Sequence, residues 1–478
     1  MSRQGDTHTG RADSALSHAV QEIRAAASSR VQFWELVALD RRETVVEVAS
    51  GEPDVVRSGQ ELTACLRLVV DGRLGTATTT RPTRVAELIN AALECAAFGP
   101  PVPALADPPD LPHTGRARHP EHPPDEEIVA GTRALANQLA GLQHRTGLLL
   151  HGAISRVDET VHVATEHGGT VETTGRWAVS GVAEAQQVGR LQTSWTSWTR
   201  APSVPDQVAD WLSQAGGWQK LPHETWPSGP QPMVLLAPHA VHTLLSPLVS
   251  SLSGTAIAMG RSFVTDQSDG ERILDPRVSL LDGTYGTDGY EAGGADGLPC
   301  PSVDDEGVLC SPLTLIEAGV PCGRYHTRHS AAATGNTRPT GHGFRGNALR
   351  RKPAQPVSAV LNNAYLHAKR ELLAPAAGLL AAMDHGVVIE SLLGGVQKGR
   401  LSPIVEAPVR QGFVVRHGHV VARLRGGVLR MDLRDALGSS LAGVSNEVWP
   451  VSRMWTGRLP FVLTCDRSDR GSGFRRTT

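Results

Sequence analysis

Several features that would indicate a function directly are missing from this sequence. The formal net charge is only −2 over 478 residues, so the chain lacks the charge excess that favours nucleic acid or an anionic membrane as a partner. No run approaches the roughly 18 apolar residues of a transmembrane helix, and the polar stretch Met1 to Arg11 has no apolar signal region. We therefore expect a soluble cytoplasmic protein that binds neither nucleic acid nor a membrane.

Cysteine and aromatic residues are scarce as well. The six cysteines form no CxxC pair, and in so long a chain this pattern is typical of reduced thiols in a cytosol. Aromatic residues make up only 4% of the chain, against 40% for all hydrophobic residues, so aliphatic side chains must build most of the cores. The length predicts two or three domains.

The common catalytic motifs are also absent. No G-x-S-x-G elbow and no P-loop occurs. The stretch Gly341 to Gly346 matches GxGxxG, but no strong strand precedes it and no helix follows, so we interpret it as a loop. The single His-Glu pair, His223-Glu224, precedes Pro227 and lacks a second histidine one turn on, so it is not a helical zinc motif. A scattered Ser-His-Asp triad stays open.

Several of the 19 histidines could in principle serve as metal ligands. His239 and His242 lie three residues apart on a predicted helix, but no glutamate accompanies them, which favours a capping or surface role. His417 and His419 flank a predicted hairpin turn and are expected to be solvated.

One further cluster combines thiols and imidazoles. Its spacing, Cys-x3-His-x2-His with two more cysteines upstream, matches no zinc module. Buried thiols in a β-rich domain are the favoured interpretation, and a metal site is the alternative. The residues are Cys300, Cys310, Cys322, His326 and His329.

The order of predicted elements indicates an α+β fold. A helix, an antiparallel meander and a second helix fill the first unit, where Asp71-Gly72 predicts a type I′ hairpin turn. The same rhythm, an α/β unit with an antiparallel sheet and flanking helices, returns after a proline-rich segment. Short apolar runs with frequent Gly and Pro then predict a C-terminal, antiparallel β-rich, barrel-like domain.

These patterns divide the chain into six parts. They are a disordered tail (1–13), an N-terminal helix-meander-helix domain (14–99), a Pro-rich linker (100–124), a central α/β domain (125–225), the β-rich C-terminal domain (226–466) and a flexible tail (467–478). Near the start of the C-terminal domain we predict a strand at Met233 to Leu236. A helix at His239 to Ser253 follows, ended by Gly254.

The densest acidic cluster is Asp304-Asp305-Glu306-Gly307. A group of carboxylates can bind a cation or a peptide amine. The favoured alternative is an acidic turn closed by glycine.

A series of short landmarks in the C-terminal third resembles one family in both content and order. The landmarks are Ser253-Gly254, Gly260 to Phe263, Leu281-Asp282, Pro301 to Gly307, Leu315 to Gly319, Thr334-Gly335-Asn336 and Ser391 to Gly395. Together with the meander around Val69 to Gly75, they are similar to the TldD/PmbA family, the TldD-related metallopeptidases. The resemblance spans roughly Ala15 to Cys465.

The resemblance implies a specific role. In this family, TldD-type chains carry an HExxxH helix and a distant cysteine as zinc ligands, whereas PmbA-type (TldE) chains share the fold without that motif. The corresponding helix here, Val241 to Gly254, has no HExxxH. The resemblance therefore implies a non-catalytic subunit without a metal or cofactor. It would form a heterodimer with a TldD-type partner, which holds zinc and cleaves small or unfolded peptides.

The same resemblance suggests which residues contact the peptide. The expected residues are Asp304, Asp305, Glu306, Gly307, Gly335, Asn336, Gly394 and Gly395.

Two other functions stay open. The less family-like loop from Gly395 to Ser402 and the unmatched Gly-rich insertion Tyr285 to Leu298 would suit a stand-alone peptide-binding or scaffold protein. An autonomous hydrolase that uses the cluster of cysteines and histidines is the third interpretation.

Overall fold

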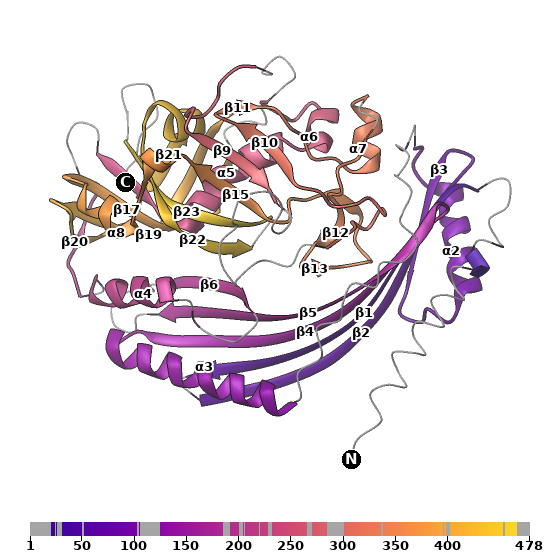
Figure 1. Ribbon diagram of the computed structural model, residues 1–478, viewed down its shortest axis with the longest axis horizontal. Coiled ribbons are helices and arrows are strands. Elements are labelled where there is room, and N and C mark those ends of the chain that lie inside the picture. The colour runs from indigo at the N-terminus through magenta and orange to yellow at the C-terminus, as the bar shows by residue number, and fades with distance from the viewer. Residues whose placement is uncertain are drawn as a thin grey trace.

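The computed structural model shows a curved antiparallel sheet that faces a larger β-rich body across its concave side (Figure 1). The structure describes residues 21–23, 25, 31–49, 52–102, 105, 125–184, 192–199, 204, 206–218, 220–227, 232–264, 270–283, 301–335, 338–394, 396–397, 402–452 and 455–465. The α+β class expected from the sequence is confirmed. Both predicted tails lie outside the described residues.

The curved sheet has six strands in the order β3-β2-β1-β4-β5-β6. Their bounds are β1 (Val31–Ala49), β2 (Glu52–Val70), β3 (Arg73–Thr79), β4 (Leu149–Thr165), β5 (Gly168–Glu184) and β6 (Gln192–Thr199). The polar residues Asp40 to Glu43 do not interrupt β1, because they pair with β2 on one side and with β4 on the other.

The predicted hairpin at Asp71-Gly72 is confirmed. Asp71 and Gly72 have φ values of 50° and 72°, and the flanking residues Val70 and Arg73 pair directly. Positive φ at both central residues is what a type I′ turn requires. The turn at His417-Gly418 also has positive φ at both residues. There the His417 side chain is exposed and its Nδ1 lies 2.7 Å from Asp384 Oδ1.

The two helix-meander-helix units share this one sheet. β1 of the first unit pairs antiparallel with β4 of the second, from Glu35–Thr165 to Ala49–His151. The start of the predicted linker extends the outer edge of β3, where Leu74 N donates to Pro100 O at 3.0 Å. Apart from residues 100–102 and 105, the linker lies outside the described residues. The boundary at 100–124 therefore separates two units along the chain that are joined within a single sheet.

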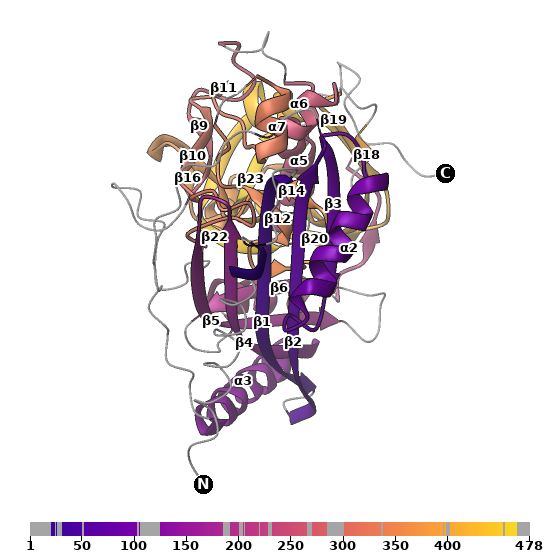
Figure 2. The same ribbon diagram turned by 90° about the vertical axis from the view of Figure 1, so that its right-hand side faces the viewer.

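Helices cover parts of this sheet. The helix α2 (Val85–Phe98) packs its buried face on β2 and β3, while α3 (Asp125–Thr146) lies beneath the opposite end of the sheet (Figures 1 and 2). The helix α4 (Asp206–Trp218) joins a core that includes both α3 and the C-terminal strands. The curved sheet and its helices α3 and α4 are thus anchored to the C-terminal body through an apolar core.

The C-terminal body contains a 14-stranded sheet with mixed pairing. Parallel pairs such as β8–β17 and β15–β23 occur among antiparallel ones, so this part is β-rich as expected but not purely antiparallel. Its strands are β7 (His223–Glu224), β8 (Met233–Leu236), β9 (Val278–Asp282), β10 (Leu313–Glu317), β11 (Val320–Pro321), β15 (Ala364–Ala368), β16 (Leu373–Ala374), β17 (His385–Leu392), β18 (Val396–Gln397), β19 (Ile404–Arg416), β20 (His419–Leu424), β21 (Val428–Asp432), β22 (Leu441–Ser452) and β23 (Thr456–Cys465).

A small three-stranded sheet and several short helices complete this body. The small sheet has the order β13-β12-β14. The elements are β12 (Gly343–Asn347), β13 (Arg350–Arg351), β14 (Val357–Ala359), α5 (Pro238–Ser251), α6 (Gly254–Ala258), α7 (Arg328–Ala333), α8 (Ala376–Ala381), and the single turns η2 (Arg370–Leu372) and η3 (Asp435–Ser439). No helix among the described residues is long and apolar enough to cross a membrane.

Two local predictions in this body are wrong. Gly254 does not end the predicted helix as a C′ residue; it is the first residue of α6, after Ser253 in an extended conformation. The stretch Gly341 to Gly346 is not wholly a loop, because Gly343 starts β12. That strand forms through pairing with β14, a partner more than ten residues away that local sequence context does not reveal.

Candidate functional site

The acidic residues Asp304 to Glu306 lie where the C-terminal body meets the curved sheet. They form the predicted turn, and Gly307 closes it with a φ of +77°. All three acidic residues are fully buried rather than solvated. Backbone N–H groups of Glu306, Val308 and Gly343 donate to the Asp304 carboxylate at 2.8–2.9 Å. Burial and the neighbouring charge of Glu306 nevertheless raise the pKa of Asp304 well above its ordinary value.

Glu306 is tied to the curved sheet through Arg67 of β2. Arg67 Nη2 lies 2.7 Å from Glu306 Oε1 and 2.6 Å from Glu35 Oε2 on β1. The second oxygen of Glu35 accepts from Arg345 Nη2 of β12 at 2.6 Å. Burial alone would raise the pKa of Glu35, but Arg67 and Arg345 outweigh it and hold that pKa below its ordinary value.

The other oxygen of Glu306 holds the start of α7. Arg328 N donates to Glu306 Oε2 at 2.7 Å, and the Arg328 guanidinium stacks over the ring of Phe33 at 4.3 Å. Space here is tight, because a Cβ on Gly343 would lie 2.5 Å from Glu306 Oε2. Glycine at position 343 therefore lets the β12 backbone approach this carboxylate.

Asp305 extends the same arrangement towards β13. Its Oδ2 accepts from Arg345 N at 2.8 Å, and its Oδ1 lies 3.0 Å from Arg351 Nε. Arg351 also donates to the carbonyl of Val303 at 2.8 Å. We call this set the buried ion network; its members are Glu35, Arg67, Asp304, Asp305, Glu306, Arg345 and Arg351.

The buried ion network joins segments that are far apart in sequence. Guanidinium groups and backbone N–H groups already occupy the carboxylate oxygens, so in this conformation the acidic turn fastens the C-terminal body to the sheet. Contact of Asp304, Asp305, Glu306 and Gly307 with a peptide stays a prediction.

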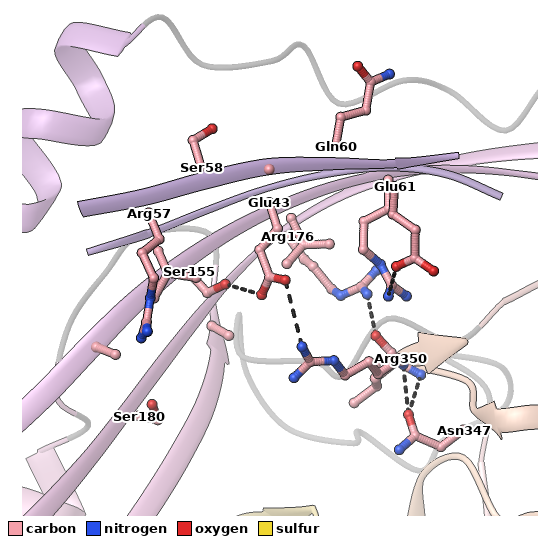
Figure 3. A pocket seen from close by; sticks show the side chains of 17 residues that line it. Glu43, Arg57, Ser58, Gln60, Glu61, Ser155, Arg176, Ser180, Asn347 and Arg350 are labelled. Carbon is pink, nitrogen blue, oxygen red and sulfur yellow. Dashed lines mark hydrogen bonds and ion pairs between the residues drawn. The ribbon is translucent and has the colours of Figure 1, made fainter. Parts of the chain in front are cut away.

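A cleft of about 730 Å³ opens beside the buried ion network, between the concave face of the sheet and β13 (Figure 3). Strands β1, β2, β4 and β5 form its floor, and the turn that carries Asn347 and Arg350 forms the opposite wall. Glu159 of β4 is a further buried carboxylate, outside the buried ion network. Its Oε2 lies between two arginines, 2.5 Å from Arg41 Nη2 and 3.6 Å from Arg176 Nη2. Both arginines line the cleft.

The cleft carries charges of both signs. Arg57 forms an exposed ion pair with Glu47, and Arg350 Nη2 lies 3.8 Å from Glu43 Oε2. Glu43 also accepts from Ser155 Oγ at 2.8 Å. The surface is therefore polar and balanced, which suits a ligand with varied polar groups better than a purely apolar one.

The helix α5 occupies the place where the family resemblance expects a zinc helix. It contains His239 and His242 but no acidic residue. Both histidines are buried, so the predicted surface role is wrong; α5 packs inside the C-terminal body. The ring of His242 stacks on Trp455 at 4.3 Å, and its Nε2 lies 3.2 Å from Trp455 O. This helix does not fit a zinc site, since it lacks a general-base carboxylate and His242 is engaged elsewhere.

The remaining expected contact residues lie apart from the acidic turn along the chain. Gly335 follows α7 and Gly394 follows β17; both are exposed and have positive φ, +73° and +63°. Asn336 and Gly395 lie outside the described residues.

The described members of the cluster of cysteines and histidines differ in their burial and in their contacts. Cys310 Sγ donates to Gly341 O at 3.1 Å, while Cys322 is exposed, so the interpretation as a buried thiol is wrong for Cys322. His329 is exposed, whereas His326 is buried against Gly254. Cys300 is not described. Across the described ranges, no group of three or more His, Cys, Asp or Glu side chains could hold a metal ion.

Four members of the buried ion network were not predicted from the sequence: Glu35, Arg67, Arg345 and Arg351. A signal for the first two was present. Each is a single charge inside an apolar strand, and the two are directly opposite in the β1–β2 pairing. Opposite charges at paired positions of neighbouring apolar strands indicate a buried ion pair.

Comparisons with known proteins agree with this fold. The family model for the PmbA/TldA metallopeptidase C-terminal domain matches residues 230–462, and the model for domain 1 matches residues 34–96. No curated protein matches the chain at a significant level.

Solved structures with the same fold are distant in sequence. TldE from Thermococcus kodakarensis has a TM-score of 0.75 at 17% identity and covers 93% of this chain and 98% of its own. A candidate modulator of DNA gyrase from Thermotoga maritima has a TM-score of 0.71 at 19% identity, covering 95% and 98%. Another from Bacteroides thetaiotaomicron has 0.71 at 17%, covering 97% and 98%. With both domain matches in place, the chain belongs to the PmbA/TldD family of metallopeptidase-related proteins.

Proposed function

We propose that this chain is a subunit without a zinc site in a heterodimeric zinc peptidase, and that a TldD-type partner carrying HExxxH supplies the metal. The complex would cleave small or unfolded peptides in the cytoplasm. The main support for this proposal comes from α5. This helix has neither the glutamate nor an available pair of histidines that zinc catalysis requires.

Other features support this role. The fold is that of the family, whose metallopeptidase domain models match this chain at both ends. The cysteines that the structure describes are thiols, as expected in a reducing compartment. The polar cleft provides a surface on which a non-catalytic subunit could hold a peptide.

The experiment compares this chain alone, a TldD-type partner alone, and both together. We expect co-elution of the two chains, zinc in the partner and the complex only, and cleavage of an unfolded peptide by the complex. Replacing the glutamate of the partner's HExxxH with glutamine should abolish cleavage, whereas Cys322→Ala in this chain should change neither zinc content nor cleavage.

Stoichiometric zinc and cleavage by this chain alone would overturn the proposal. Loss of activity in Cys322→Ala would instead favour the autonomous hydrolase. If the chains do not co-elute, a stand-alone peptide-binding or scaffold protein becomes the better interpretation.

A further inference from the structure

The strand β2 has an open outer edge along half of its length. β3 pairs only with Ala64 to Val70 of β2, and no described residue pairs with the outer edge of β2 before Ala64. Every residue from Glu52 to Glu61 is exposed. A long open edge offers unpaired backbone donors and acceptors to any extended chain.

The hairpin turn shows which residues face that edge. In a two-residue hairpin the flanking residues, Val70 and Arg73, form a hydrogen-bonded pair. The β2–β3 and β1–β2 registers run without a bulge in β2 from Val70 back to Val55. Even-numbered residues of β2 therefore direct their N–H and C=O groups outward, and at the open edge these are Val56, Ser58, Gln60 and Leu62.

The odd-numbered residues face the cleft. Arg57, Gly59 and Glu61 line it, together with the backbone of their even-numbered neighbours. Figure 3 shows the side chains of Arg57 and Glu61 on one face of the sheet and those of Ser58 and Gln60 on the other. A strand added to this edge would therefore place alternate side chains into the cleft.

The opposite side of the sheet provides a contrast. On β5, residues Thr170 and Glu172 are buried. Ser302 N donates to the Glu172 carboxylate at 3.0 Å. The C-terminal body thus covers β5 there. At the level of the open edge itself, which aligns across β1 and β4 with Thr173 to Val179 of β5, Arg176 is buried and donates to the carbonyl of Leu349, whereas Val56 to Glu61 of β2 are exposed.

The character of the surface indicates which occupant fits. In the cleft, Arg57 and Glu61 flank Gly59. A bound strand could therefore place a positive, a negative or an uncharged side chain beside them. The large hydrophobic residues exposed on this part of β2 are only Val55 and Val56, which is a poor basis for the apolar core of a stable protein dimer. Recognition through the backbone with tolerant side-chain contacts is typical of peptide binding by strand addition.

We propose that the open edge of β2, from Val56 to Leu62, binds an extended peptide by strand addition and directs its alternate side chains into the cleft. This deepens the proposed function, since it rests on that function for the identity of the peptide as a substrate. The binding event itself requires neither zinc nor the partner.

The test uses the full chain and a fluorescein-labelled peptide of about ten residues, alternating threonine and serine, long enough to span the edge. Anisotropy should report saturable binding. Ser58→Pro removes one outward N–H at a position where an edge strand tolerates proline. We expect it to weaken binding by about tenfold or more, whereas Ser58→Ala, which also loses the Ser58–Thr44 contact, should bind as the unaltered chain does.

A second measurement does not depend on a variant that folds. The same peptide with N-methyl groups at alternate residues, in both registers, should bind the unaltered chain at least about tenfold more weakly, because one edge of its backbone is blocked. Circular dichroism would check that Ser58→Pro keeps its fold.

Three results would overturn the inference: no saturable binding, equal binding of the N-methylated peptides, or a self-association of the chain that Ser58→Pro abolishes. The last would assign the edge to a second copy. Failure here, alongside cleavage by the complex with its partner, would leave the proposed function intact. If the chain binds the peptide at this edge but forms no complex with a zinc-bearing partner, the proposed function fails and the inference about the edge stands.

Discussion

At the scale of single residues, Arg67 is the centre of the buried ion network. One of its nitrogens lies within 2.7 Å of a carboxylate oxygen from Glu35 and another from Glu306. Both glutamates are fully buried, so each depends on a guanidinium for compensation. Such an arrangement adds little net stability compared with an apolar core, but loss of one partner is costly because a buried charge is left uncompensated.

We therefore expect Arg67→Ala to lower the free energy of unfolding by about 3–5 kcal/mol, measured by urea denaturation. Arg84→Ala is the matched control, since Arg84 forms an exposed pair with Glu87; it should cost less than about 1 kcal/mol. Equal effects of the two substitutions would show that the buried ion network does not fasten the sheet.

His326 is one residue whose protonation should affect stability at mildly acidic pH. It lies buried against Gly254, and burial, with a smaller contribution from Arg324, lowers its pKa to about 4. The folded protein therefore excludes a proton that the unfolded chain binds below its ordinary pKa of about 6.5. The contribution of neutral His326 to the free energy of unfolding is therefore complete above a pH of about 6.5. It is lost as the pH falls towards 4.

Between pH 7 and pH 5 this contribution should decline by about 2 kcal/mol. The change to test is His326→Gln, which cannot titrate. Urea denaturation at both pH values should give a smaller loss for the variant than for the unaltered chain. Parallel losses in the two proteins would assign the pH dependence to other groups.

At the scale of elements, the packing of α2 on the sheet depends on a glycine. A Cβ on Gly75 of β3 would lie 2.0 Å from Ala92 O and 2.8 Å from the Cβ of Ala96. Backbone atoms cannot yield as a flexible side chain can, so any side chain at position 75 must push α2 away from the strand.

Gly75→Ala should consequently destabilise the protein by about 1–3 kcal/mol, seen as a lower midpoint of thermal or urea unfolding. Gly59→Ala on the neighbouring strand is the control, because a Cβ there meets nothing within 4 Å. It should be neutral or slightly stabilising. An unchanged midpoint for Gly75→Ala would mean that α2 can shift without cost.

At the scale of the whole molecule, α4 links the curved sheet to the C-terminal body. Trp211 of α4 is buried, packs edge-on against Trp449 and lies against Phe461, and its Nε1 donates to Glu390 Oε2 at 2.8 Å. These partners lie on β22, β23 and β17 of the C-terminal sheet. One side chain therefore contributes both apolar area and a hydrogen bond to a buried carboxylate across the two parts.

Trp211→Ala is expected to cost about 3–5 kcal/mol through the cavity and the lost contact. If the two parts form one cooperative unit, unfolding monitored by far-UV circular dichroism and by tryptophan fluorescence should shift together. Trp211→Phe, which keeps most of the ring, should cost less. Separate transitions in the unaltered protein would contradict a single cooperative unit.

The sequence was most informative where local rules decide. The Asp71-Gly72 turn correctly located the hairpin between β2 and β3, and the absence of HExxxH on the helix after Met233 to Leu236 was visible in the letters alone. It was less informative where distant segments meet. Histidines on α5 looked like surface residues because nothing local shows that the β-rich body surrounds this helix.

The sequence by itself determined the α+β class, the family and the absence of an HExxxH motif, because periodicity, turn residues and motif spacing are local properties. Only the tertiary structure decided that both N-terminal units share one sheet and that Asp304 to Glu306 are buried among arginines. It also decided that no described strand pairs with the outer edge of β2 before Ala64, beside a polar cleft. Each of these depends on pairing between residues far apart in the chain, which contact energies rather than local preference determine.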